Sequence, residues 1–216
     1  MYTLRMVIRI LIADDHLMLA ETFKILVEQQ ADMQVVGLSV DGRDAVKQVD
    51  ALRPDIVVMD LTMPEMNGAD ATRALLAKHP GCRVVVLSAH TDAERVRRAL
   101  KAGALGYLPK SEGVEEIITA IRAVHAGQRY LGPRITEAVI GANGLADDPL
   151  EKLSAREREI LQLLVEGHTG AEIAQRLTLS QKTVETYRAR LVEKLGIRDL
   201  PGLVRFAIQR GVVDLD

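Results

Sequence analysis

Cysteine and aromatic residues are scarce in this chain of 216 residues, which has one cysteine, two phenylalanines, four tyrosines and no tryptophan. With Cys82 alone, the chain can form neither an intramolecular disulfide nor a metal cage of thiolates. Cys82 begins an apolar segment typical of a strand, so we expect a small buried hydrophobic residue. The fold must therefore depend on burying its apolar side chains, and 48% of the residues are hydrophobic.

Long hydrophobic segments are also missing. None reaches the ~20 residues that are needed to cross a bilayer. The first residues, MYTLRMVIRILI, lead directly into the folded pattern and lack the small-residue cleavage site of a signal peptide. We therefore expect a cytoplasmic protein that does not associate with a membrane.

Charge is nearly balanced overall, with 28 Lys and Arg against 30 Asp and Glu. The balance is different between residues 176 and 198, where only Glu185 and Glu193 oppose a group of cationic side chains. The group consists of Arg176, Lys182, Arg188, Arg190, Lys194 and Arg198. Such a local excess of positive charge favours an anionic partner such as nucleic acid.

Short apolar segments alternate with helical periodicity over the first ~126 residues. The predicted strands cover residues 8–13, 34–39, 56–59, 83–88 and 106–108, and nearly all of their residues are apolar. Such strands are typical of a parallel sheet that is covered on both faces. The alternation predicts an α/β fold, with a flavodoxin-like, doubly wound, five-stranded parallel sheet.

Glycine, proline and aspartate gather after this pattern. Residues 127–150 contain GQRYLGP, GANG and DDP, with a weak helical patch at 135–140 between them. This composition is typical of a linker. We therefore expect an α/β domain at residues 6–126, a linker at 127–150 and a second domain at 151–216.

The second domain shows helical periodicity only. Two capping boxes, SARE and TGAE, begin its first two helices, and Ser180 caps the third. The four expected helices cover residues 155–166, 170–177, 181–195 and about 200–210. The second and third have the proportions of a helix-turn-helix, so we expect a four-helix, all-α domain built around that motif.

Carboxylates follow two of the predicted strands, with Asp14 and Asp15 after the first and Asp60 after the third. The carboxyl ends of parallel strands meet at one edge of a sheet, so these groups should converge. Crowded carboxylates need a neutralising cation, and oxygen ligands favour Mg2+ or Mn2+. We expect no metal-ligand role for the histidines His16, His79, His125 and His168.

Ser88 ends the fourth predicted strand, and Lys110 comes just after the fifth. A hydroxyl and an ammonium beside a metal-bound carboxylate suit a phosphoryl group on Asp60. Taken singly, each residue is ordinary, because an aspartate at a strand end is usually solvated and a lysine usually lies on the surface. Their combination at consecutive strand ends predicts a phosphorylation site.

One face of the predicted helix 181–195 is apolar, because Val184, Tyr187, Leu191 and Leu195 recur at helical spacing. The opposite face and its flanks carry Lys182, Glu185, Thr186, Arg188, Ala189, Arg190 and Lys194. A charged face is by default only solvated, but this one coincides with the local excess of cations. Lys and Arg would hold DNA phosphates, and bases would be read near the N-terminal half of the helix.

The sequences at the predicted strand ends resemble the receiver domain of bacterial two-component response regulators. The matching segments are ADDH at 13–16, MDLTMP at 59–64, LSA at 87–89 and GYLPK at 106–110. The resemblance implies that Asp60 accepts a phosphoryl group. It also implies that Asp15, the Asp60 carboxylate and the backbone carbonyl of Thr62 bind the metal directly. Asp14 would act through a water molecule.

The same resemblance implies roles for the residues around the phosphorylated aspartate. Ser88 and Tyr107 would form the coupled switch pair, with Tyr107 turning inward on phosphorylation. Lys110 would contact the phosphoryl group. Thr62 and His90 occupy the positions that set phosphoryl lifetime in this family.

Residues 153–197 resemble the LuxR-type helix-turn-helix, and with the receiver the resemblance to the NarL/FixJ family covers nearly the whole chain. It implies base-facing positions for Glu185, Thr186 and Ala189. The residues suited to phosphate contacts are Lys182, Thr183, Arg188 and Lys194.

Three features depart from the family pattern. Pro109 precedes Lys110 instead of following it, so the cis peptide bond often found after that lysine is not expected. Tyr187 replaces the commoner histidine, and a Gly-Ala pair at 170–171 replaces the frequent Asn-Lys pair. We expect the last two changes to affect contacts with the DNA backbone more than the fold.

The resemblance implies a two-component response regulator that accepts a phosphoryl group from a partner histidine kinase. It would bind double-stranded DNA as a sequence-specific transcription regulator, with Mg2+ or Mn2+ as cofactor. Phosphorylation would favour a homodimer, or release the second domain from an inhibitory contact. Apart from metal-dependent self-phosphorylation and autodephosphorylation at Asp60, it would not be an enzyme.

Three alternatives differ in testable ways. An aspartate-nucleophile phosphatase would carry Asp-x-Asp, whereas Leu61 and Thr62 follow Asp60. A nucleotide-binding enzyme would carry Gly-x-Gly-x-x-Gly after the first strand, and that motif is absent there. A regulator that binds DNA without phosphorylation stays open, although the acidic pair, Ser88 and Lys110 argue against it.

Overall fold

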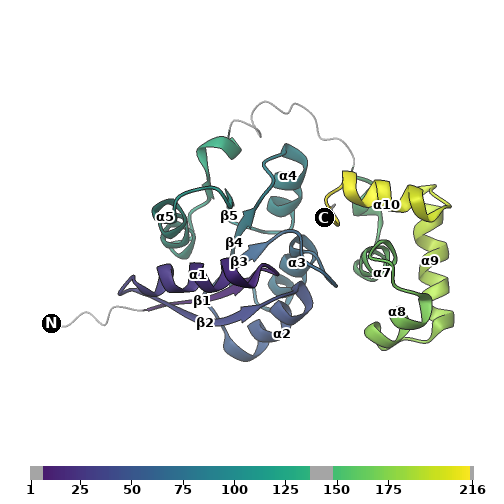
Figure 1. Cartoon of the computed structure of the whole chain (residues 1–216), viewed down its shortest axis with the longest axis horizontal. Coiled ribbons are helices and arrows are strands. Elements are labelled where there is room, and N and C mark those ends of the chain that lie inside the picture. Colours follow the sequence, from purple (N-terminus) through teal and green to yellow (C-terminus); the bar gives the residue numbers. More distant parts are fainter. Residues whose placement is uncertain (1–6, 137–147, 215–216) are drawn as a thin grey trace. The chain divides into compact units, whose positions relative to one another are not determined.

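A computed structural model of the chain describes residues 7–136 and 148–214. These residues form two compact units, one containing a sheet with its helices and the other containing helices only (Figure 1). Most of the helical patch predicted at 135–140, and the part of the predicted linker from 137 to 147, lie outside the described residues.

The first unit is built on a parallel sheet. Its strands are β1 (Ile8–Ala13), β2 (Met33–Ser39), β3 (Ile56–Asp60), β4 (Arg83–Ser88), β5 (Gly106–Pro109) and β6 (Tyr130–Leu131). They lie in the order β2-β1-β3-β4-β5-β6, and every neighbouring pair is parallel. This order places the carboxyl ends of β1, β3, β4 and β5 side by side at one edge.

Helices cover both faces of the sheet, as the doubly wound prediction requires (Figure 1). The helices α1 (Leu17–Glu28) and α5 (Val114–His125) share one apolar core with β1, β3 and β4. The other face carries α2 (Gly42–Leu52), α3 (Gly68–Lys78) and α4 (Ala93–Lys101), where α2 contacts α3 and α3 contacts α4. The strands are nearly all apolar because both of their faces are buried.

The sheet has a sixth strand that the sequence did not predict. In β6, Tyr130 pairs with Gly106 and Leu131 pairs with Tyr107 of β5. This strand has only two residues and lies between glycines, so its composition is that of a turn, and its pairing depends on the neighbouring strand. The sheet thus continues into the segment that was predicted as a linker.

The second unit contains four α-helices, in agreement with the prediction. They are α7 (Ala155–Val165), α8 (Gly170–Leu177), α9 (Gln181–Leu195) and α10 (Leu200–Gln209), preceded by a 3-10 helix at Pro149–Lys152 that was not predicted. Both predicted capping boxes are present, at Ser154 and Thr169. The Ser180 side chain accepts a hydrogen bond from Thr183 N and begins α9, and Gly196, with φ +70, follows its last residue.

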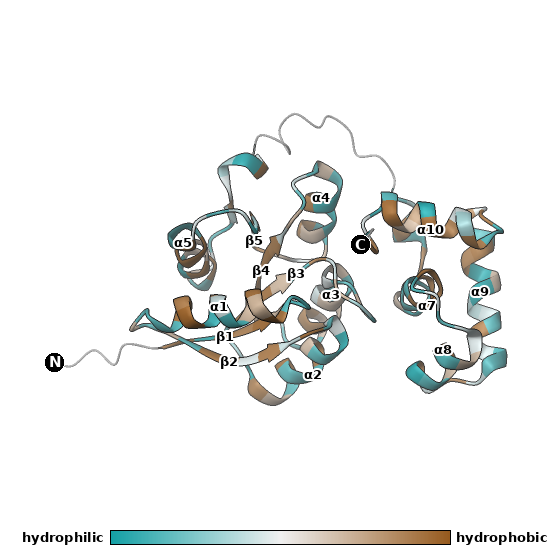
Figure 2. Cartoon of the chain, viewed as in Figure 1, coloured by the Kyte–Doolittle hydropathy of each residue, from teal (hydrophilic) through white to brown (hydrophobic). Residues whose placement is uncertain are grey.

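The helices of the second unit enclose a small apolar core. Val184 and Leu191 of α9 are buried against Leu163 of α7 and Ile173 of α8, as their spacing predicted. Hydrophilic residues predominate on α9 otherwise, whereas the strands of the first unit are mainly hydrophobic (Figure 2). Among the described residues, no helix combines the length and apolar character required to span a membrane.

Candidate functional site

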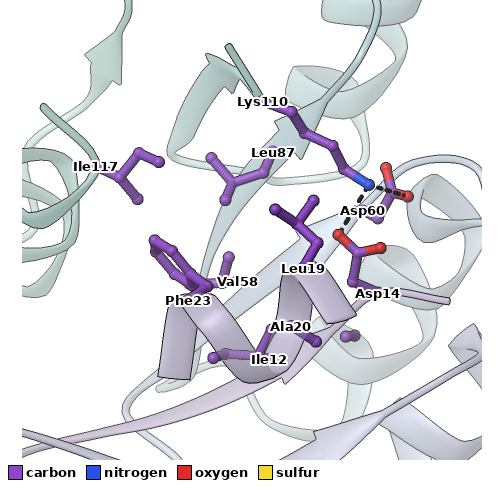
Figure 3. A pocket seen from close by; sticks show the side chains of 11 residues that line it. Ile12, Asp14, Leu19, Ala20, Phe23, Val58, Asp60, Leu87, Lys110 and Ile117 are labelled. Atoms are coloured by element: carbon purple, nitrogen blue, oxygen red, sulfur yellow. Dashed lines mark hydrogen bonds and ion pairs between the residues drawn. The ribbon is translucent and has the colours of Figure 1, made fainter. Parts of the chain in front are cut away.

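The strand ends bring Asp14, Asp60 and Lys110 into direct contact. The Lys110 Nζ lies 2.8 Å from Asp14 Oδ2 and 2.8 Å from Asp60 Oδ2, so the ammonium bridges the two carboxylates (Figure 3). The side chains of Asp14 and Asp60 are only 8% and 5% exposed. Two anions and one cation are therefore held together largely out of water.

Burial changes the acidity of these groups. It raises the pKa of Asp60 to about 6, and the nearby Lys110 ammonium opposes that rise only in part. Burial also lowers the pKa of Lys110, but the Asp60 and Asp14 carboxylates outweigh it and hold that pKa above its usual value. At neutral pH, Asp60 is thus an ionised carboxylate in a poorly solvated place, next to a lysine that stays charged.

An apolar hollow lies beside the carboxylates, between α1 and the sheet. Its volume is about 40 Å³, and side chains from several elements line it (Figure 3). The apolar lining includes Leu19, Phe23, Val58, Leu87 and Ile117. These side chains account for the poor solvation of the Asp60 carboxylate.

The acidic residues at this edge could hold a metal ion. Asp14, Asp15, His16 and Asp60 each offer one ligand atom, and these atoms lie within 4.8 Å of one another. Three carboxylates fit a hard divalent cation. His16 belongs to this group, although no metal-ligand role was expected for it. Its Nδ1 lies 2.9 Å from Asp15 Oδ1, and its position directly after the acidic pair was the signal for it.

Ser88 and Tyr107 meet through the backbone of His90. The Ser88 hydroxyl accepts a hydrogen bond from His90 N at 3.1 Å, and the Tyr107 hydroxyl donates to His90 O at 2.9 Å. Tyr107 is fully buried, and burial raises its pKa far above the usual range. Tyr107 therefore lies inward in this structure. Thr62 is half-buried in the loop that follows β3.

The peptide bonds around Lys110 are regular. Lys110 N donates to Ser88 O at 2.8 Å, which ties the end of β5 to the end of β4. No cis peptide bond occurs in residues 7–136 or 148–214.

In the second unit, α9 presents one exposed face. The exposed side chains of this face include Lys182, Glu185, Thr186, Arg188, Ala189 and Arg190. The Arg190 guanidinium lies 5.9 Å from the ring centre of Tyr187, which is half-buried against the core. Thr183 is held at the start of the helix, where its hydroxyl and that of Ser180 are 2.8 Å apart. The turn before α9 contains Thr178 in a left-handed conformation with φ 54.

Two protein families match the two units in this order. The family described as "Response regulator receiver domain" matches residues 10–122, and "Bacterial regulatory proteins, luxR family" matches residues 151–207. The chain belongs to the response-regulator family. This response regulator combines a receiver domain with a LuxR-type DNA-binding domain, and it is a DNA-binding transcription regulator.

Relatives of this response regulator match it along nearly the whole length. "Oxygen regulatory protein NreC" of Staphylococcus carnosus is 34% identical over 216 residues, covering 95% of this chain and 99% of that protein. "Response regulator GacA" of Pseudomonas aeruginosa is 38% identical over 210 residues, covering 96% and 98%. A solved structure, "Response Regulator ChrA in Heme-Sensing Two Component System", is 30% identical with a TM-score of 0.54, covering 96% of this chain and 99% of that one.

Sequence reasoning missed several residues that shape the receiver site of this response regulator. A Cβ atom at Gly68 would lie 1.9 Å from the Asp60 carbonyl oxygen, so the chain can close against β3 only with glycine there. Asn67 is buried and caps α3, and its Oδ1 accepts a hydrogen bond from Arg98 of α4 at 2.9 Å. The Asn-Gly pair shortly after Asp60 was the available signal, whereas nothing local marked Arg98.

One predicted phosphate contact of this response regulator has another partner. The Lys194 Nζ lies 2.6 Å from Oε2 of Glu157, whose side chain is only 3% exposed. The same oxygen accepts a hydrogen bond from Ser154 N at 2.7 Å. Burial raises the pKa of Glu157, but Lys194 and Ser154 outweigh it and hold that pKa below its usual value. Lys194 thus joins α9 to the start of α7.

Proposed function

We propose that Asp60 is the phosphoacceptor and that phosphoryl transfer from a partner histidine kinase controls DNA binding by the second domain. The observation that carries the proposal is the bridge of Lys110 between Asp14 and Asp60 at a buried strand edge. A carboxylate oxygen of Asp60 would form the new P–O bond while the P–N bond of the kinase phosphohistidine breaks. The phosphorylated protein would act in the cytoplasm, where its DNA and its phosphodonor are present.

The residues at this edge have the donor atoms for Mg2+ or Mn2+. Asp14, Asp15, Asp60 and the backbone carbonyl of Thr62 would hold it. When bound, the ion supplies positive charge that offsets the carboxylates and the phosphoryl oxygens. Lys110 is placed to neutralise a phosphoryl oxygen on Asp60.

The response to phosphorylation would begin at Ser88. Its hydroxyl can donate to a phosphoryl oxygen, and a shift of Ser88 would move His90, whose backbone binds both Ser88 and Tyr107. The surface of α4 and α5 would then repack. Thr62 and His90, which flank the phosphoryl position, would set how fast autodephosphorylation ends the signal.

On the DNA, α9 would enter the major groove. Lys182, Thr183, Arg188 and Arg190 would contact phosphates, and the exposed side chains between them would face bases. We propose that the phosphorylated form binds double-stranded DNA as a homodimer, with one α9 in each half-site.

Gel shifts with Asp60→Asn protein test this mechanism. We expect a phosphodonor with Mg2+ to raise the DNA affinity of the unaltered protein at least several-fold and to leave the Asp60→Asn variant unchanged. Asp55→Asn is the matched control, because Asp55 lies just before the opposite end of β3, and it should respond like the unaltered protein. Donor-stimulated binding by the Asp60→Asn variant would contradict the proposal. Equal binding by both proteins with and without the donor would favour a phosphorylation-independent regulator.

A further inference from the structure

We infer that Glu185 selects the base sequence by accepting a hydrogen bond from the amino group of cytosine in the major groove. Thr186 and Ala189 beside it select the methyl group of thymine. This inference rests on the proposed docking of α9 in the groove. It goes further by assigning the chemical groups that the helix recognises.

Glu185 is an exposed carboxylate on the face of α9 that is otherwise cationic. Within the described parts of the chain, no ion pair or hydrogen bond holds its carboxylate. A carboxylate that faces DNA repels the phosphates and weakens binding to every sequence. It improves discrimination only where a base returns a hydrogen bond. The cytosine amino group does so without the N7 acceptor that lies beside the amino group of adenine and would repel a carboxylate.

The start of α8 leaves room for this carboxylate. A Cβ atom at Gly170 would lie 3.3 Å from Glu185 Oε1, closer than ordinary van der Waals contact. Gly170 is the first residue of α8, whose N-terminal end carries partial positive charge. Glycine at position 170 therefore leaves room for the Glu185 carboxylate, which a larger side chain at position 170 would displace.

Thr186 presents an apolar group because its hydroxyl is occupied. Its Oγ1 donates a hydrogen bond to Lys182 O at 2.9 Å, within the helix. Ala189 lies three residues further along the same exposed face and offers only a methyl group. Two adjacent methyl groups suit contact with the C5-methyl group of thymine.

The test compares sequences selected from random double-stranded DNA by the full-length protein and by two variants. Glu185→Ala should lose the preference for cytosine at one position of each half-site, by roughly fivefold to tenfold. Its binding to non-specific DNA should increase. Glu193→Ala removes an equal charge from another exposed site of α9 and should keep the cytosine preference.

Several outcomes would overturn the inference. A cytosine preference that survives Glu185→Ala, or that disappears equally in Glu193→Ala, would exclude Glu185 as the reader. A fall in thermal stability of Glu185→Ala with unchanged base preference would show that the carboxylate only supports α8. If Lys182→Ala and Arg188→Ala left DNA affinity unchanged, the proposed docking of α9 in the groove would be wrong. That outcome concerns the proposed function and is distinct from the role of Glu185.

Replacing the selected thymine by uracil tests the methyl contact. Removing the C5-methyl group should weaken binding of the unaltered protein about threefold. It should have no further effect on Ala189→Gly combined with Thr186→Ser. Equal weakening of the protein and the double variant would contradict the role of these two residues.

Discussion

Asp60 and Lys110 show how burial alters the chemistry of single side chains. Their order along the chain was predictable, because each follows a recognisable strand. The contacts of Lys110 with both carboxylates and the apolar hollow beside them were not predictable. The contacts depend on how the side chains turn at the strand ends, and the hollow depends on how α1 packs on the sheet. The same limit applies to Tyr107, whose inward position follows from a hydrogen bond to the backbone of His90.

The raised pKa of Asp60 predicts that this carboxylate destabilises the receiver domain at neutral pH. Its pKa is about 6 in the fold against 3.8 in the unfolded chain, so folding favours the protonated form. The destabilisation by Asp60 is absent below about pH 4, grows between pH 4 and 6, and is complete above pH 6. We expect Asp60→Asn to increase the free energy of unfolding by about 2–3 kcal/mol at pH 7.5.

Hydrogen exchange of the β3 amides, in the presence of a chelator, measures this effect in the receiver domain alone. The gain from Asp60→Asn should shrink when the comparison is repeated at pH 4.5. Asp55→Asn should show no such pH-dependent gain. A gain that is equal at both pH values would contradict the assigned acidity.

Most elements were predictable to within a residue or two, for two physical reasons. Strands buried on both faces are continuously apolar. A Ser or Thr capping box in the sequence marks the residue at which a helix begins. β6 was not predicted because two residues are too few to show a periodic pattern. Its strand conformation depends on pairing with β5, which the local sequence does not reveal. Contacts between elements, such as Lys194 with Glu157, leave no local pattern at all.

The bond between Lys194 and Glu157 predicts that Lys194 positions α9 instead of contacting phosphate. Lys194→Met should weaken DNA binding and destabilise the second unit, because a buried carboxylate loses its partner. The slope of log affinity against log salt should stay unchanged. Arg188→Met should reduce that slope by about 0.9, the value for one lost phosphate contact.

Salt titrations of both variants, with Lys194→Arg as the conservative control, decide between the two roles. Lys194→Arg keeps the charge and should recover most of the stability. A salt slope that falls by a similar amount in Lys194→Met and Arg188→Met would show that Lys194 contacts a DNA phosphate.

At the scale of the whole molecule, the chain joins a domain that receives a signal to a domain that reads DNA. The sequence predicts this division because the first part alternates strand and helix patterns of hydrophobic residues, whereas the second part shows the helix pattern alone. The two matched families cover residues 10–122 and 151–207, in that order.

A homodimer with one α9 in each half-site predicts that DNA binding depends on helical phase. Inserting about 5 base pairs between the half-sites turns one of them to the opposite side of the duplex. The phosphorylated protein should then lose cooperative binding in gel shifts. An insertion of about 10 base pairs should restore part of it. Cooperative binding that ignores the spacing would contradict a rigid pair of half-sites.

Gly68 places a steric constraint on the proposed phosphorylation site. The space for its Cβ is already filled by the Asp60 carbonyl oxygen, 1.9 Å away. Chemistry at Asp60 can be tuned by changing charges nearby, but position 68 can accommodate no added atom without moving the end of β3. Under the proposed mechanism, substitutions at positions 62 and 90 would alter the lifetime of the phosphoryl group, whereas at position 68 even one methyl group would displace the proposed phosphoacceptor.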